Sequence, residues 1–174
     1  MSWTTPTTRS TGDLITAAIW NADLVDNLNF LYGSLPSARA YHNASQSIAA
    51  STTETKAFNS ERWDNDIIHD TASNNSRLTC KRAGKYLIIL NMAIGAPSSG
   101  SRETRIDLVL NGATIIDRES DYPGAVVIGY TVATIYDLAI NDYVEHQVWI
   151  DAATSAWPSL ANGYPEFMMH RIGG

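Results

Sequence analysis

Four histidines are the residues best suited to acid–base chemistry in this sequence: His42, His69, His146 and His170. His69 precedes Asp70, an order in which a carboxylate could orient an imidazole, but covalent hydrolysis would also need a nucleophile. The sequence contains no G-x-S-x-G elbow, phosphate-binding loop, dinucleotide-binding glycine turn or H-E-x-x-H helix. His146 alternates with apolar residues on a predicted strand, which favours a hydrogen-bonded histidine of a core or interface. We therefore expect no enzyme activity and no cofactor.

Two further groups of residues could bind a metal or react. Asp64, Asp66 and Asp70 form an oxygen-rich cluster, but they lack the glycine and terminal glutamate of an EF-hand loop. We interpret them as a solvated turn, with a cation site as the alternative. Cys80 lies beside two basic residues, which would lower its pKa. As the single cysteine it cannot form an internal disulfide, and we expect an inert thiol.

Aromatic residues followed by proline mark three loop-like positions, Tyr122, Trp157 and Tyr164. Aromatic side chains in loops are frequent at binding sites, where they could stack on the sugars of a host surface glycan. The alternative is packing at the base of an oligomer. We predict these three residues as candidates for surface binding.

Most of the chain must supply strands to hold these residues. Period-two runs rich in β-branched and aromatic residues cover 85–94, 105–110, 126–136 and 143–150. Asn111-Gly112 lies between two such runs and is typical of a type I′ hairpin turn. Many short strands separated by turns, without intervening helices, predict an all-β antiparallel sandwich or jelly roll over residues 38–174.

Some predicted strands are apolar on both faces. Tyr86, Ile88 and Leu90 alternate with Leu87 and Ile89, and 126–136 repeats the pattern. A two-layer sandwich buries one face of each sheet, so the other face needs a cover. A loop or the N-terminal helix could supply it, but we expect a second subunit. The residues that we assign to the core or the subunit interface are Tyr86, Ile88, Leu90, Tyr130, Trp149 and Phe167.

The N-terminal residues have a different pattern. Residues 1–13 are rich in Ser and Thr and predict an extended arm, whereas 14–35 predict a helix with Thr16 as N-cap and Gly33 at its end. Apolar residues recur at heptad spacing, but two heptads are marginal alone. A coiled coil and an amphipathic helix packed on its own domain or on a neighbour both remain open. The residues predicted to anchor or trimerise this segment are Trp20, Leu24, Leu28 and Leu31.

Four segments resemble the C1q-like family. They are Phe58–Asp64 (FNSERWD) followed by Cys80–Ile88 (CKRAGKYLI), then Leu138–Val144 (LAINDYV), and last Glu166–Ile172 (EFMMHRI). Asn141 stands where the family usually has glycine, a tolerable change because Asn also accepts positive φ. The resemblance covers 38–172 and implies a C1q/TNF-like homotrimer of ten-stranded jelly rolls.

The segment Gly12–Leu28 is similar to one that opens many tailed-phage structural proteins, in which I-T-A, small and apolar residues and Asn precede L-x-D-N-L. This similarity implies a phage or prophage virion protein whose N-terminus binds another capsid or tail protein. Together the two resemblances lead us to expect a homotrimeric surface knob, either a head fibre or decoration or a tail component. The distal loops of such a knob could bind the host surface.

Composition and charge exclude several other roles. A net charge of −6 with only 12 Lys and Arg argues against binding nucleic acid. The sequence has neither a secretory signal nor an apolar run of about 20 residues, so we expect cytoplasmic synthesis, no membrane insertion and a final place on the virion surface. The alternative function is a carbohydrate-binding or adhesion module of bacterial or prophage origin.

Overall fold

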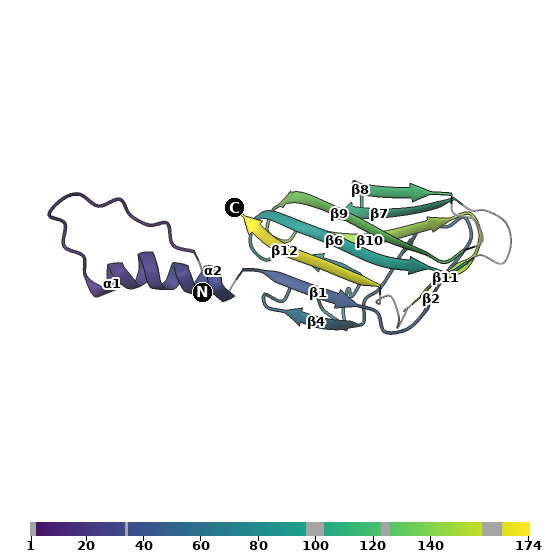
Figure 1. The fold of residues 1–174 in the computed structure, drawn as a ribbon, viewed down its shortest axis with the longest axis horizontal. Helices are drawn as coiled ribbons and strands as arrows, with labels where there is room; N and C mark the ends of the chain where they lie inside the picture. The colour runs from purple at the N-terminus through teal and green to yellow at the C-terminus, as the bar shows by residue number, and fades with distance from the viewer. Residues whose placement is uncertain (1–2, 34, 97–102, 123–125, 158–164) are drawn as a thin grey trace. The chain divides into compact units, whose positions relative to one another are not determined.

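The computed structural model describes residues 3–33, 35–96, 103–122, 126–157 and 165–174, with the backbone alone at 155–157. The chain divides into two compact units, Met1–Leu35 and Pro36–Gly174. Figure 1 shows a helical N-terminal unit and a β-domain of two layers. No helix in these described ranges is long and apolar enough to cross a membrane.

The N-terminal unit is an arm that returns alongside one helix. The helix consists of α1 (Ala17–Trp20), a π-helical turn η1 (Asn21–Val25) and α2 (Asp26–Gly33). Thr16 caps it, because its Oγ1 accepts a hydrogen bond from the Ile19 N–H at 3.3 Å. Since Thr16 has extended backbone, Leu14 and Ile15 precede the helix, and the expected start at residue 14 is corrected to Ala17.

The β-domain consists of two antiparallel sheets. The first sheet has the order β2 (Gln46–Ile48), β11 (Thr154–Trp157), β6 (Gly84–Ile94), β12 (Glu166–Gly173), β1 (Ser37–Tyr41) and β4 (Ser60–Asp64), with β9 (Ile128–Leu138) also paired to β6. The second sheet has the order β3 (Glu54–Thr55), β10 (Tyr143–Ile150), β7 (Thr104–Leu110) and β8 (Thr114–Asp121), with β5 (Arg77–Thr79) paired to β10.

Turn residues with positive φ connect these strands. Asn111 and Gly112 have φ of 52° and 70° in the β7–β8 hairpin, as a type I′ turn requires. Asn141 has φ of 72° just before β10, the conformation expected where the C1q-like pattern has glycine. These local choices fix the ends of the strands and hence their register.

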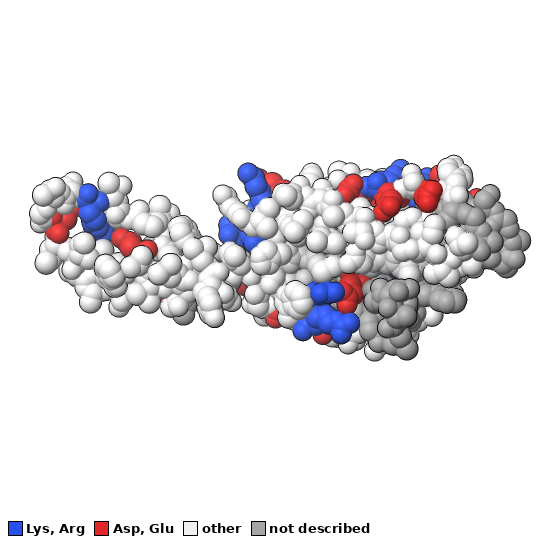
Figure 2. All heavy atoms as spheres, in the orientation of Figure 1, with Lys and Arg blue, Asp and Glu red and all other residues white. Residues whose placement is uncertain are grey.

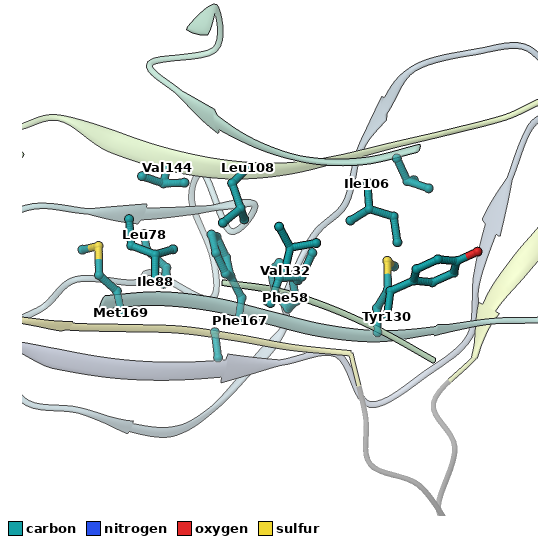
Figure 3. Packing of buried hydrophobic residues seen from close by; sticks show 14 of the residues in the cluster. Phe58, Leu78, Ile88, Ile106, Leu108, Tyr130, Val132, Val144, Phe167 and Met169 are labelled. Carbon is teal, nitrogen blue, oxygen red and sulfur yellow. The ribbon is translucent and has the colours of Figure 1, made fainter. Parts of the chain in front are cut away.

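The core lies between the two sheets. Phe58 and Phe167 pack with ring centroids 5.4 Å apart at its centre, and Figure 3 shows apolar side chains of both layers pointing toward each other. Each large apolar side chain buried there contributes about 1.5–3 kcal/mol to folding. Its largest fully buried members are Ile48, Phe58, Ile68, Leu78, Tyr86, Ile88, Leu90, Ile94, Ile106, Leu108 and Phe167.

Candidate functional site

Five of the six residues assigned to the core or interface lie in this core. Tyr86, Ile88, Leu90, Tyr130 and Phe167 are all buried against the second sheet. The sixth, Trp149, lies on the outer face of the second sheet, where the Arg105 guanidinium stacks 3.9 Å from its ring centroid. A subunit contact on the first sheet would therefore use the residues next to these five along their strands, because those side chains point to the outer face of the sheet.

The register of the first sheet shows which side chains share that outer face. Residues directly opposite on paired strands project to the same side. One row of such partners runs across five strands, from Ala133 through Ile89, Met168 and Arg39 to Trp63. Four of its five members are apolar.

A second row beside it has the same character. Ile135 on β9 lies opposite Leu87 on β6, which lies opposite His170 on β12. Ile135 is 59% exposed and Leu87 is partly exposed. We call Trp63, Leu87, Ile89, Ala133, Ile135 and Met168 the uncovered face, because the described residues of the β-domain place no layer over them.

Polar groups border the uncovered face on the next row. Thr131 on β9 lies opposite Asn91 on β6 and donates its hydroxyl hydrogen bond to Asn91 Oδ1 at 2.9 Å. Asn91 in turn lies opposite Glu166 on β12. The apolar surface therefore ends at a row of hydrogen-bonding side chains, as the rim of a protein interface does.

An ion cluster forms one corner of this border. Glu166 is 5% exposed, and its carboxylate accepts hydrogen bonds from Arg39 Nε at 2.7 Å and Arg62 Nε at 3.1 Å. Arg62 also stacks over Tyr41 at 4.4 Å, and Arg39 lies 5.7 Å from the Trp63 ring. These contacts fix two arginines and two aromatic rings beside the apolar rows.

The outer face of the second sheet is different. Its side chains form charge pairs: Arg118 binds Asp107 through two bonds of 2.6 and 2.7 Å, and Arg77 lies 3.5 Å from Glu145. Figure 2 shows the first sheet from outside, where a broad area over β6, β9 and β12 is free of charged side chains and the coloured groups lie at its margins. The outer face of the second sheet is thus suited to contact with water, and the outer face of the first sheet to contact with another protein surface.

The three aspartates do not converge on a common point. Asp64 accepts hydrogen bonds from the N–H groups of Asp66 and His69, and Asp66 pairs with Arg82 at 3.0 Å. Asp70 caps a turn by accepting from the N–H groups of Ala72 and Ser73, which lowers its pKa. Within the described ranges no group of three His, Cys, Asp or Glu residues could hold a metal ion.

The histidines have structural positions. His69 is held by Glu61 Oε1, 2.9 Å from Nδ1, and by the Asn75 carbonyl, 3.1 Å from Nε2, so its orienting acid is Glu61 and not Asp70. His146 lies in the core as expected. However, neither of its ring nitrogens has a hydrogen-bond partner in the described part of the chain, which corrects the expected bonding.

Cys80 is fully buried, and its Sγ–H points to the Arg82 carbonyl at 3.2 Å. Burial raises the pKa of the thiol, so the neighbouring cations do not activate it. The structure gives this residue the properties of an inert thiol, which agrees with the interpretation of the sequence.

Of the three candidate binding aromatics, Tyr122 is described and is 68% exposed. A hydrogen bond from its hydroxyl to the Glu103 carboxylate raises the pKa of the phenol. Tyr164 and the side chain of Trp157 lie outside the described residues. Surface binding through these three residues therefore stays a prediction.

The predicted anchoring residues all lie on the surface of the N-terminal unit. Trp20, Leu24, Leu28 and Leu31 are each exposed, although each is large and apolar. The helix therefore has an apolar surface of its own.

Comparisons with known proteins agree with the fold described above. No protein-family model matches the chain, and no curated protein matches its sequence. The globular domain of zebrafish complement 1qA protein is similar in structure, with a TM-score of 0.52 and 15% identity over 79% of this chain and 97% of that one. The predicted jelly roll is thereby confirmed: the chain has a C1q-like β-sandwich behind a short helix.

Proposed function

We propose that this protein is a non-enzymatic structural component of a phage virion, a homotrimeric knob joined to the particle by its N-terminal unit. The uncovered face of the first sheet carries this proposal. Its apolar rows cross the sheet, its rim is hydrogen-bonded, and the domain has no further layer of its own among the described residues. A second copy of the chain would remove these side chains from water, at about 25 cal/mol per Å² of apolar surface.

The number of subunits comes from the resemblance to C1q-like domains, which implies a trimer. In a ring with threefold symmetry each chain presents one surface to one neighbour and another surface to the next. An apolar face bordered by the fixed arginines Arg39 and Arg62 suits such a contact, because the arginines lose little freedom on binding.

A structural role is supported by what the reactive side chains do. His69 binds Glu61 and a backbone carbonyl, and Cys80 is an inert buried thiol. Asp64, Asp66 and Asp70 are occupied by backbone N–H groups or by arginine. Each of these groups serves the fold of its own chain.

The placement in a virion is supported by the N-terminal segment. Residues 12–28 are similar to a segment that opens many tailed-phage structural proteins, and they belong to the compact unit Met1–Leu35, which is distinct from the β-domain. In this proposal the unit attaches the knob to a capsid or tail protein, and the knob faces outward. Labelling of purified particles with an antibody against the β-domain would place the chain on the head, on the tail or on neither.

Sedimentation of the purified chain at micromolar concentration tests the trimer. We expect a trimer for the natural sequence and a monomer for Ile135→Asp, which places a carboxylate on the uncovered face. The matched control is Ile115→Asp on β8, an isoleucine 47% exposed on the other sheet, which should leave the trimer intact. A monomer before any substitution, or equal loss of assembly in both variants, would contradict the proposal.

A further inference from the structure

The helix of the N-terminal unit has one surface without a partner in its own unit. Trp20, Leu24, Leu28 and Leu31, which we call the leucine row, are exposed, and Val25 beside them is also exposed. Leu28 alone leaves 56% of its surface in water. Buried helix faces carry such residues at a spacing of three and four, whereas a helix exposed on this side would carry polar ones.

The arm already occupies another surface of the same helix. Asn27 is buried and binds Thr4 in both directions, accepting from its N–H at 2.9 Å and donating to its carbonyl at 2.8 Å. The rings of Trp3 and Phe30 pack with centroids 6.3 Å apart. These contacts fix the arm, so the arm is not available to cover the leucine row.

The charged side chains Arg9, Asp13 and Asp23 of this unit make their contacts outside the leucine row. Arg9 of the arm pairs with Asp23 on the arm side, and Asp13 accepts a hydrogen bond from the Ser10 N–H. The row itself contains no ionisable side chain. When identical helices meet in parallel, each residue faces its own copies, so an uncharged row avoids like-charge repulsion whereas a charged one would not.

We propose that the leucine row of this helix packs against the same row of two other copies of the chain, as a parallel three-helix bundle with the arms outside. In the sequence, Asn21 falls at an a position of the heptad pattern, three residues before Leu24, and a single buried Asn at such a position fixes the register of a coiled coil. The partners of the leucine row are thus other copies of this same chain.

The inference rests on the proposed trimer of β-domains. Residues 34–36 alone join the helix to β1, so association of the β-domains would bring three helices close together. Tethering of this kind gives an effective concentration in the millimolar range, which compensates for the low stability of a two-heptad helix.

Cysteine cross-linking in the full-length chain tests the bundle. In a Cys80→Ala background, Leu28→Cys places a thiol on the leucine row. Asp26→Cys places a thiol at an exposed position outside the row, two residues earlier. Thiols at equivalent core positions of neighbouring helices lie within reach of a disulfide, whereas outer positions do not. After mild oxidation at micromolar concentration we expect covalent dimers from Leu28→Cys, severalfold more than from Asp26→Cys.

Sedimentation of the same samples separates this inference from the proposed function. A trimer in solution without covalent dimers of Leu28→Cys would overturn the bundle and leave the trimeric knob intact, with the row free for another virion protein. Equal cross-linking of both variants would also overturn it, because the contact would not be specific to the row. A monomer in solution would overturn both proposals.

Discussion

Arg62 on β4 and Glu166 on β12 form an ion pair of 3.0 Å, although β1 lies between their strands. The pairing of β1 with β4 shifts register between Arg39 and Ala40, so Arg62 is the extra residue of a β-bulge. A bulge redirects a side chain from its regular alternation. Arg62 therefore joins Arg39 on the carboxylate of Glu166, beside the uncovered face.

Glu166→Gln should lower the free energy of unfolding by about 1–3 kcal/mol, because charge-assisted hydrogen bonds to a buried carboxylate are replaced by neutral ones. Urea unfolding at one fixed protein concentration measures the change. The matched variant is Glu103→Gln, whose carboxylate pairs with Arg105 at 3.1 Å and accepts the Tyr122 hydroxyl. Because this carboxylate is more exposed than that of Glu166, its ion pair should contribute at most about 1 kcal/mol. Equal losses in the two variants would show that burial of Glu166 has no special effect.

Much of the fold could be predicted from the sequence because the signals are local. The run 143–150 coincides with β10, and 85–94 differs from β6 by one residue. Asn111-Gly112 identifies its hairpin because the turn needs positive φ at both positions. Alternation also showed that Tyr86 and Leu87 face opposite ways, which the structure confirms.

The candidate site could not be predicted in the same way, because it depends on pairing between distant strands. Whether Tyr86 or Leu87 faces the core depends on where the second sheet packs, and nothing within the strand fixes that. The row from Ala133 to Trp63 requires four pairings in the correct register. The bulge at Arg62 and the capture of His69 by Glu61 likewise leave no periodic signal in the sequence.

Gly84→Ala should destabilise the β-domain by about 2 kcal/mol or more. Gly84 has φ of 143°, which L residues rarely adopt, and a Cβ there would lie 2.3 Å from the Gly173 carbonyl oxygen. Thermal unfolding monitored by circular dichroism measures the effect. Gly129→Ala on β9 is the control, since its Cβ would meet no atom within 4 Å. A Gly84→Ala domain as stable as the control would contradict this account of the β6–β12 contact.

His146 predicts a loss of stability in acid. It is fully buried beside Phe58, and the carbonyl of His146 accepts the Lys56 N–H at 3.2 Å. Burial is the main cause that lowers the pKa of His146 to about 4, with the Lys56 cation acting in the same direction and Asp107 opposing it. The ordinary pKa of histidine is 6.5. Between pH 6.5 and 4, His146 is therefore protonated in the unfolded chain but stays neutral in the folded chain.

The contribution of His146 to the free energy of unfolding should therefore be fully present above pH 6.5. As the pH falls from 6.5 to 4, the free energy of unfolding should decrease by about 3 kcal/mol through this residue. His146→Leu should remove that part of the fall, while other acid-sensitive groups keep theirs. At pH 7 the variant should be at least as stable as the natural protein, because two buried nitrogens without partners are lost. Urea unfolding at pH 7 and pH 4.5 measures both effects, and an equal acid loss in the two proteins would show that His146 is protonated in the folded state.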